Sequence, residues 1–194
     1  GGAGIVAAHL QALGASCAHL SVVGEDEVAE FAEGKLADFG VQRHLLRDKS
    51  RPTTFKTRYL IGNQKVFRVS KLKDHPLLPN VEAQVIDTLQ EVAPDYDGIV
   101  VSDFNYGLLT KGVVEKLESL ARSHSLLLIG DQQCSSQIGD ITKFKGYDLL
   151  CPNEREARIS LHNREAGLEW VANELFMRTS LRNLLLKLGP VGLI

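Results

Sequence analysis

The second half of the chain alternates short apolar runs with stretches whose apolar residues recur at helical spacing. The apolar runs occupy residues 97–102, 125–130, 147–150 and 183–188. The helical patterns occupy residues 81–92, 111–122, 154–161 and 165–178. Strands that are apolar throughout and separated by helices are typical of a parallel sheet covered on both faces. The sequence therefore predicts an α/β fold with a mostly parallel central sheet.

Residues 1–50 show the same alternation. Apolar residues at helical spacing over residues 3–13 end at Gly14, and residues 16–23 predict a buried strand. Asp26 follows that strand, and an aspartate in this position accepts hydrogen bonds from the first amides of a helix. We therefore expect a second helix from Asp26 to about Phe39.

Residues 53–70 have a different pattern. Two runs rich in β-branched and aromatic residues, TTFKTRYLI and QKVFRVS, are joined by Gly62 and Asn63. Such a pair of runs with a Gly/Asn turn predicts a β-hairpin. A hairpin inserted among βα units can form a flap or a dimer surface, or it can be a plain edge hairpin. The pattern alone leaves these alternatives open.

Composition and charge exclude several classes of protein. With 194 residues, 44% of them hydrophobic, the chain can bury a core of its own. A formal net charge of -2 gives no field that would gather nucleic acid or an anionic membrane. The three cysteines lack Cys-x-x-Cys spacing, so they predict neither a disulfide framework nor a zinc site. We expect a cytoplasmic protein with no nucleic-acid or membrane partner.

Polar and glycine residues gather directly after the predicted strands. They are Asp103, Gly107, Asp131, Asn153, Glu156, Gly189 and Gly192. In an open parallel sheet, ligands bind beyond the carboxyl ends of the strands. Carboxylate and amide oxygens beside glycine amides suit a magnesium-bound nucleotide. Each residue also has a structural interpretation: Asp103 as a turn residue, Asn153 as a helix cap after Pro152, and the glycines as a tight turn.

The opening glycines allow two interpretations. Gly1 and Gly2 at the start of a helix would let backbone amides approach an anion or a sugar hydroxyl closely. The pattern Gly2-x-Gly4-x-x-Ala7, with an acidic residue about 20 positions later, also fits the dinucleotide-binding fingerprint. An NAD(P)-binding oxidoreductase of the Rossmann type is therefore an alternative.

A basic pair lies in the first arm of the hairpin. Lys56 and Arg58 are two residues apart in a predicted strand, so their side chains share one face, with Cβ atoms about 7 Å apart. Such a pair could hold a substrate phosphate. Charges of this kind also discourage aggregation at a sheet edge, which is the structural alternative. A phosphate loop at residues 107–112 is excluded, because Val113 and Val114 stand where Lys and Ser/Thr are required.

Seven sequence blocks together carry a family resemblance. They are GGAGIVAAHLQALG, VVGEDE, RPTTFKTRYLIGNQKVFRV, VSDFNYGLLT, LLIGDQQ, LCPNEREA and LLLKLGPVGL. In this order they resemble the PfkB/ribokinase carbohydrate kinases, most of all the heptose-7-phosphate kinase domain of bifunctional ADP-heptose synthases. The resemblance implies a ribokinase-like three-layer sandwich over residues 1–194, with a hairpin flap at about 53–70 and core βα units at 1–50 and 80–194. It also implies transfer of the γ-phosphoryl group of ATP, with Mg²⁺, to a hydroxyl of a sugar or sugar phosphate.

The resemblance also assigns residues to the two ligands. On the sugar or sugar-phosphate side it places Gly1, Gly2, Lys56, Arg58, Asp103 and Gly107. On the nucleotide side it places Asp131, Asn153, Glu156, Gly189 and Gly192, with Glu156 at the metal. Three positions depart from the family pattern: Ile5 replaces an Asn, Tyr106 a Lys, and Lys187 a residue that is often Thr.

The family's GAGD segment, which carries the catalytic base, would follow Ile194, and the family's first strand would precede Gly1. The resemblance thus implies a domain that is incomplete at both ends, with no base assigned and no activity of its own. A non-catalytic sugar-binding relative is a further alternative. A homodimer through the hairpin is the expected assembly.

Overall fold

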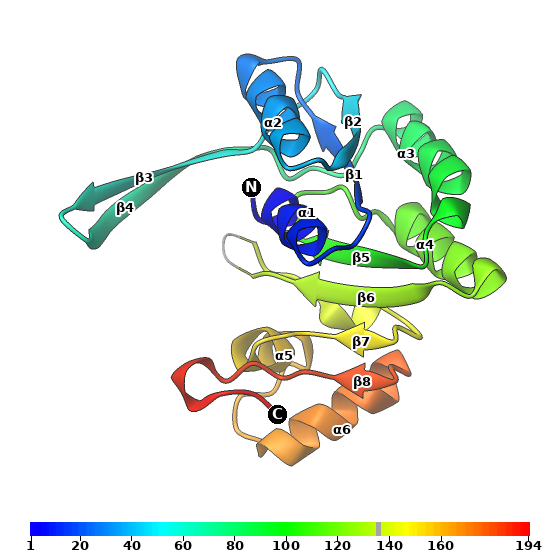
Figure 1. The fold of residues 1–194 in the computed structure, drawn as a ribbon. Coiled ribbons are helices and arrows are strands. Elements are labelled where there is room, and N and C mark those ends of the chain that lie inside the picture. The colour runs from blue at the N-terminus through cyan, green and yellow to red at the C-terminus, as the bar shows by residue number, and fades with distance from the viewer. Residues whose placement is uncertain (135–136) are drawn as a thin grey trace. The chain divides into compact units, whose positions relative to one another are not determined.

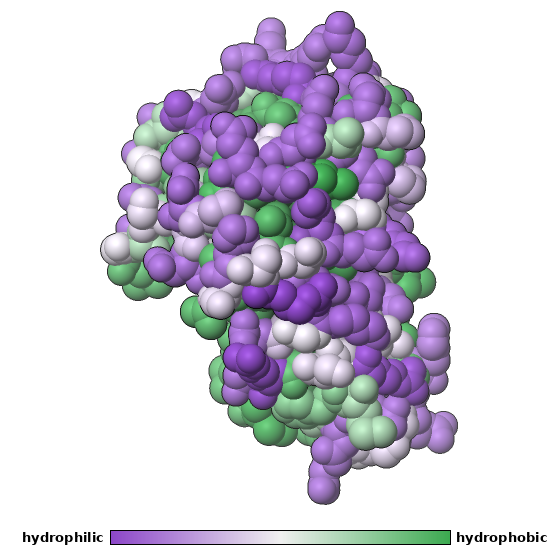
Figure 2. Space-filling view, turned by 90° about the vertical axis from the view of Figure 1, so that its right-hand side faces the viewer, coloured by the Kyte–Doolittle hydropathy of each residue, from purple (hydrophilic) through white to green (hydrophobic). Residues whose placement is uncertain are grey.

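The computed structural model describes residues 1–134 and 137–194. The chain divides into two compact units, Gly1–Val85 and Ile86–Ile194, which are described separately below. None of the helices in the described ranges is long and apolar enough to cross a membrane. Hydrophilic residues cover most of the molecular face in Figure 2, where apolar residues form separate groups.

The first unit begins with two helices and a pair of parallel strands. Helix α1 (Gly2–Ala12), strand β1 (Ala18–Val23), helix α2 (Glu27–Asp38) and strand β2 (Gln42–Arg47) follow one another (Figure 1). The strands pair in register from Ala18 with Gln42 to Val23 with Arg47. The predicted cap is confirmed, since Asp26 Oδ1 accepts the amide of Ala29 at 3.0 Å. The buried residues of α2 are Ala29 and Leu36, whereas Phe31 and Phe39 are exposed.

The predicted hairpin is confirmed. Strands β3 (Phe55–Ile61) and β4 (Gln64–Lys71) are antiparallel and form the two-stranded ribbon of Figure 1. Gly62 turns the chain with φ 58°, a conformation that glycine adopts without steric cost. Arg58 pairs with Arg68 on one face, and the rings of Tyr59 and Phe67 stack on the other, with centroids 4.4 Å apart.

The base of the hairpin is closed by a buried guanidinium. Arg51 lies before β3, and its Nε donates to Asp48 Oδ2 at 2.8 Å. Its Nη2 donates to the carbonyl oxygens of His75 and Pro76, which lie after β4, at 2.9 and 3.2 Å. The side chains of Arg51 and Asp48 are 7% and 2% exposed, so this ion pair is shielded from solvent. One side chain thus joins the two segments that flank the hairpin.

The second unit contains the predicted parallel sheet. Its strands are β5 (Gly98–Asp103), β6 (Leu127–Gln132), β7 (Leu149–Leu150) and β8 (Asn183–Leu184). They lie side by side in chain order and all pairs are parallel (Figure 1). The helices are α3 (Pro79–Val92), which crosses the boundary between the units, α4 (Lys111–His124), α5 (Glu154–Ser160) and α6 (Leu168–Thr179). Short 3-10 turns lie at η1 (Ala93–Asp95), η2 (Ile141–Lys143) and η3 (Gly189–Val191).

Several strand boundaries differ from those predicted, by one residue in β5 and by two or more residues in β1, β6, β7 and β8. Strand β6 begins and ends two residues later than expected, so that Asp131 lies inside the strand. Regular strand structure in β8 ends at Leu184 rather than at residue 188. Hydrogen bonds nevertheless carry the pairing further, from Leu185 N to Leu150 O at 2.9 Å and from Lys187 N to Pro152 O at 2.9 Å. The segment that follows β8 therefore remains hydrogen-bonded to β7 and to the residues after it, as far as Lys187.

Glycine allows close packing in the middle of β6. A Cβ atom on Gly130 would lie 2.7 Å from a methyl group of Leu150 and 3.0 Å from the ring of Tyr147. Both of these residues are completely buried, together with Ile141, Phe144, Val171 and Leu175. The buried core of the second unit thus packs directly against β6, the strand that carries Asp131.

Candidate functional site

The carboxyl edge of the four-stranded sheet collects the predicted polar residues of the second unit. Asp103 ends β5 and pairs with Gln132 of β6, beside Asp131. Asn153 follows β7 and forms a parallel bridge with Lys187, which follows β8. The structure thus brings Asp103, Asp131 and Asn153 to neighbouring positions along one edge, as the sequence predicts.

Asp103 is an internal anchor. It is 4% exposed, and its Oδ1 accepts the amide of Asn105 at 2.7 Å. Its Oδ2 accepts hydrogen bonds from Gln132 Nε2 at 3.2 Å and from Lys143 Nζ at 2.6 Å. Both carboxylate oxygens are therefore engaged, and Lys143 forms a charge-assisted hydrogen bond with one of them.

The loop after Asp103 is held in an unusual backbone conformation. Asn105 has φ 58°, in the left-handed region. Its side chain donates to the carbonyl of Gln133 at 3.0 Å and accepts from Gln132 at 3.2 Å. Gly139 packs so closely that a Cβ there would lie 2.4 Å from the Asn105 side chain. Gly107, two residues further along, has φ 83°. The hydrogen bonds of Asn105 and the close packing of Gly139 together define the conformation of this loop.

Asn153 and Glu156 form a capping box at the start of α5. Asn153 Oδ1 accepts the amide of Glu156 at 2.8 Å, and Glu156 Oε2 accepts the amide of Asn153 at 2.8 Å. Glu156 Oε1 accepts the amide of Cys134 at 3.2 Å, and Glu156 is 5% exposed. Each oxygen of Glu156 thus accepts one backbone amide, and one further lone pair remains on each oxygen. No cluster of three or more potential metal-binding side chains occurs within residues 1–134 and 137–194.

Asp131 and Lys187 form a second ion pair at this edge. Lys187 Nζ lies 2.7 Å from Asp131 Oδ1, and the two side chains are 38% and 27% exposed. The pair joins β6 to the segment after β8, and Cys151 lies at the end of the intervening β7. The pKa of the Cys151 thiol is raised, mainly by burial and further by Asp131, while Lys187 acts in the opposite direction. The thiol therefore stays protonated between two opposite charges.

The turn after Lys187 contains the two predicted glycines. Gly189 and Gly192 have φ 62° and 116°, and Leu188 N donates to Gly192 O at 2.8 Å. Both are left-handed positions that favour glycine. The turn returns the chain so that Leu193 pairs with Lys187 in an antiparallel bridge.

The predicted residues of the first unit lie on two of its elements. Gly1 is the N-cap of α1, and Gly2 is the first residue of this helix. Gly2 and Gly4 thus lie inside a helix rather than in a strand-to-helix turn, and the Rossmann alternative loses the feature on which it rested. Lys56 is half-buried and Arg58 is exposed, and they pair with Ser70 and Arg68 on the same face of the hairpin.

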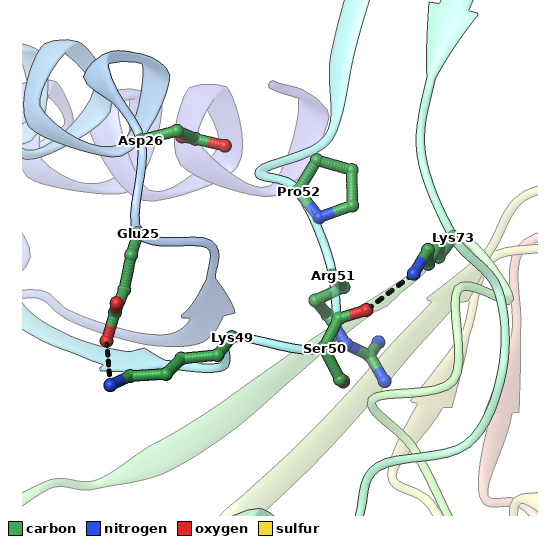
Figure 3. Close-up of a pocket in the computed structure, with 7 residues that line it drawn as sticks. All are labelled: Glu25, Asp26, Lys49, Ser50, Arg51, Pro52 and Lys73. Carbon is green, nitrogen blue, oxygen red and sulfur yellow. Dashed lines mark hydrogen bonds and ion pairs between the residues drawn. The ribbon is translucent and has the colours of Figure 1, made fainter.

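A polar hollow of about 380 Å³ lies in the first unit, at the carboxyl ends of β1 and β2 (Figure 3). Its lining residues are Glu25, Asp26, Lys49, Ser50, Arg51, Pro52 and Lys73. Lys49 reaches across to Glu25 at 3.8 Å, and Lys73 Nζ donates to Ser50 O at 2.8 Å. Asp26 also accepts the amide of Thr53 at 2.9 Å, so it joins the loops that follow both strands. Sequence reasoning did not indicate this hollow.

Comparison with known proteins decides the family. Residues 1–194 match the pfkB family carbohydrate kinase. The chain belongs to the pfkB family of carbohydrate kinases. It is 35% identical over 161 residues to the Bifunctional protein HldE of Helicobacter hepaticus, covering 82% of this chain and 33% of that protein. It is 30% identical over 196 residues to the protein of the same name from Nitratiruptor sp., covering 100% of this chain and 40% of that protein. The chain thus spans well under half the length of these pfkB relatives.

Solved structures show the same fold. Phosphofructokinase-2 from Escherichia coli, described as a tetrameric inhibited form, matches with a TM-score of 0.75 at 16% identity. This match covers 100% of the present chain and 63% of that one. Ribokinase from Giardia lamblia matches with a TM-score of 0.77 at 16% identity, covering 99% and 63%. The chain therefore has the ribokinase-like α/β fold of the pfkB family, as its sequence predicts.

Sequence reasoning missed the two lysines that neutralise the predicted aspartates. Lys143 lies on η2, 40 residues after its partner Asp103, and no motif marks it. Lys187 was noted only as a departure from the pfkB pattern. The signal that could have found it is a charged residue at the end of an otherwise apolar run, LLLKL.

Proposed function

We propose that the protein transfers the γ-phosphoryl group of ATP to a hydroxyl of a sugar phosphate of the heptose-phosphate class. Membership of the pfkB family supports the reaction, because these carbohydrate kinases use ATP and typically require a metal. The relatives named Bifunctional protein HldE, at 30–35% identity, support the heptose-phosphate class. A solved structure of the same fold was obtained with fructose-6-phosphate, which supports a phosphorylated sugar.

The observation that carries this proposal is the polar edge of the second unit. Phosphoryl transfer is catalysed mainly by positioning and by charge stabilisation. Asp131, Asn153 and Lys187 present a carboxylate, an amide and an ammonium at adjacent strand ends. We assign the nucleotide side to Asp131, Asn153, Glu156, Gly189 and Gly192. Within this set, Glu156 also fixes the backbone of Asn153 and Cys134, whose amides it accepts.

Mg²⁺ is proposed as the metal, and its part would be to neutralise phosphate charge. Glu156 is the residue proposed at the metal site. Each of its oxygens accepts one backbone amide, and the second lone pair on each oxygen could bind the metal or a metal-bound water.

For the sugar side we propose Gly1, Gly2, Lys56, Arg58, Asp103 and Gly107. Lys56 and Arg58 supply an ammonium and a guanidinium on one face of the hairpin, groups that suit a sugar phosphate. Asp103 is assigned a positioning role, because it accepts hydrogen bonds from Asn105, Gln132 and Lys143 and so fixes the start of the loop that carries Gly107. The catalytic base is not assigned to any residue of the chain.

We also propose that the hairpin mediates homodimer formation. Phe55, Tyr59, Phe67 and Val69 share the face opposite Lys56 and Arg58, and each is 46–52% exposed. An exposed apolar face of this kind is typical of a protein interface. The second copy of the chain is the proposed occupant, and the tetramer named for the phosphofructokinase-2 structure shows that members of this fold assemble.

Purified full-length protein tests the function directly. ADP release is measured with ATP and Mg²⁺ and one acceptor at a time: heptose 7-phosphate, fructose 6-phosphate, or the corresponding free sugar. The expected result is acceptor-dependent ADP release that is fastest with heptose 7-phosphate. ADP release that no acceptor accelerates, together with sugar binding in calorimetry, would instead identify a non-catalytic sugar-binding relative. A cytoplasmic location remains a prediction, which cell fractionation tests.

A further inference from the structure

Asn105 lies in a backbone conformation that costs free energy. Its φ of 58° is in the left-handed region, which residues other than glycine seldom adopt. Two hydrogen bonds hold its side chain there, one donated to Gln133 O at 3.0 Å and one accepted from Gln132 Nε2 at 3.2 Å. Its own amide donates to Asp103 Oδ1 at 2.7 Å. Backbone and side chain of Asn105 are thus both fixed to the carboxyl ends of β5 and β6.

Gln132 carries a second cost. The residue is completely buried, and its Nε2 donates to Asp103 Oδ2 and to Asn105 Oδ1, each at 3.2 Å. Its Oε1 is buried as well and has no hydrogen-bond partner in the part of the chain that the structure describes. A buried acceptor without a partner lowers stability, and an apolar side chain of the same shape would avoid this loss. What the amide of Gln132 contributes is its donor, which joins Asp103 to Asn105.

The segment around Gly139 is shaped to the same side chain. A Cβ atom on Gly139 would lie 2.4 Å from Nδ2 and 2.5 Å from Oδ1 of Asn105. The amide of Gly139 donates to the Sγ of Cys134 at 3.4 Å, so this close approach is itself held by a hydrogen bond. Glycine is required here by the space that Asn105 occupies. Three separate parts of the second unit therefore meet around one asparagine.

An ordinary turn needs none of these features. Glycine at position 105 would adopt φ 58° without steric cost, and an apolar residue at position 132 would leave no buried acceptor unpaired. Backbone strain and costly buried polar groups gather at functional sites. The loop of residues 104–107 leaves β5 at the carboxyl edge of the sheet, where an open parallel sheet binds its ligands. The costs at Asn105 and Gln132 thus coincide with the place where a ligand is expected.

We propose that Asn105 and Gln132 are positioning residues for the sugar acceptor, because together they hold the loop of residues 104–107 in the conformation that receives it. This inference rests on the proposed kinase function and adds to it the pair that sets the sugar side of the site. Gln132 acts without touching the acceptor, since it is completely buried. A displacement of about 1 Å in such a loop is enough to lower the rate about 100-fold.

Steady-state kinetics of the full-length protein tests the pair. Heptose 7-phosphate is varied at saturating ATP and Mg²⁺, and ATP is then varied at saturating acceptor. Asn105→Gly and Gln132→Met should each lower kcat/KM for the acceptor about 10- to 100-fold and leave the KM for ATP within about twofold. Both variants should unfold at a urea concentration close to that of the wild type, because each removes one structural cost. Unchanged kcat/KM, or equal effects on both substrates, would overturn the proposal.

Ser125 provides a matched control. It has φ 55° and ends α4 two residues before β6 begins, at the opposite edge of the sheet from Gln132. Ser125→Gly releases the same kind of left-handed strain as Asn105→Gly and should change the kinetics with neither substrate. If the two glycine variants behave alike, the conformation of Asn105 has no special part in the site and the proposal is wrong.

The double variant tests whether the two residues act as one unit. If Gln132 acts through Asn105, Gln132→Met should add less than about threefold to the loss that Asn105→Gly already causes. Losses that multiply would instead show two independent effects and contradict the pairing. If Gln132→Met does not fold, Asn105→Gly and its control decide.

Hydrogen exchange and calorimetry separate the inference from the function on which it rests. The amides of residues 104–107 should exchange about 10-fold faster in Asn105→Gly and Gln132→Met than in the wild type, and unchanged exchange overturns the inference at any level of activity. If the wild type releases ADP with no acceptor, the kinase proposal fails, and its affinity for heptose 7-phosphate then decides. A lower affinity in both variants supports the inference, whereas an equal affinity, or a wild type that binds no sugar phosphate, overturns it too.

Discussion

Asn153 and Glu156 each bind the other's backbone amide, and both hydrogen bonds measure 2.8 Å. The second oxygen of Glu156 holds the amide of Cys134 across the sheet edge. Glu156→Gln keeps one carbonyl oxygen but faces a backbone amide with an NH₂ group. We expect a loss of about 1–3 kcal/mol in the free energy of unfolding, measured with urea. Glu154→Gln, on the same helical turn, is the control. Glu154 forms an ion pair with Arg158 in which its own carboxylate is exposed to solvent. Equal losses in both variants would contradict this account of Glu156.

Asp103 should matter for stability more than its neighbour Asp131. Asp103→Asn removes the charge that holds Lys143 and rearranges the hydrogen bonds of Gln132 and Asn105. We expect a loss of about 1–3 kcal/mol in the free energy of unfolding. Asp131→Asn breaks a partly exposed pair and should cost under about 1 kcal/mol. Denaturant titration of both variants measures the difference, and the reverse order would refute the anchoring role.

The buried pair of Asp48 and Arg51 predicts a defined dependence on pH. Burial opposes ionisation of Asp48, but the hydrogen bonds from Ser50 and Arg51 outweigh it and hold its pKa below the ordinary value of 3.8. A carboxyl with a depressed folded-state pKa stabilises the fold above its unfolded value and loses this contribution as the pH falls through the folded value. Asp48→Asn should therefore be much less stable than wild type at pH 6, and the difference should shrink below pH 3.8. A difference that stays constant from pH 6 to pH 2 would contradict the sign.

The hairpin's apolar face should control assembly. Phe67→Lys places a charge opposite Tyr59, where the two rings now stack. If this face joins two copies, the variant should be monomeric in analytical ultracentrifugation at concentrations where the wild type is dimeric. Arg68→Glu alters the adjacent residue on the other face and should leave the dimer intact. A wild type that is monomeric at all concentrations would remove the proposal.

Lys56 and Arg58 should distinguish phosphorylated from free sugars. Lys56→Ala and Arg58→Ala each remove a cation from one face of the hairpin. We expect the KM for a sugar phosphate to rise about 10-fold or more, with little change for the free sugar. Lys65→Ala, in the opposite strand near the turn, is the control for a general loss of charge. Equal effects on both acceptors would assign Lys56 and Arg58 a structural role.

Much of the fold is predictable because local chemistry and tertiary structure agree. Asp26 caps α2 and Gly62 turns the hairpin because these residue types favour those conformations. Strand β2 was not predicted, since its sequence QRHLLR carries charged residues and its first two positions are exposed. Its pairing with β1 comes from tertiary context, which a local pattern does not contain.

The candidate site is predictable only in part, for a related reason. The sheet topology brings Asp103, Asp131 and Asn153 to one edge, and parallel strands make this foreseeable. The partners of these residues are not foreseeable, because Lys143 and Lys187 lie 40 and 56 residues further along the chain. Which groups a carboxylate binds depends on such distant partners, which the local sequence pattern does not contain.

The guanidinium of Arg51 holds the two arms of the hairpin together independently of the peptide bonds in the turn. It fastens the segment before β3 to the carbonyls of His75 and Pro76 after β4, so the two arms are tied at their base without relying on the turn. A protease that nicks the exposed tip at Gly62 should leave both arms attached, and a peptide tag inserted there should be tolerated. The tip of the hairpin is thus a suitable place to attach a reporter, whereas Arg51, which holds the base of the hairpin, must be left unchanged.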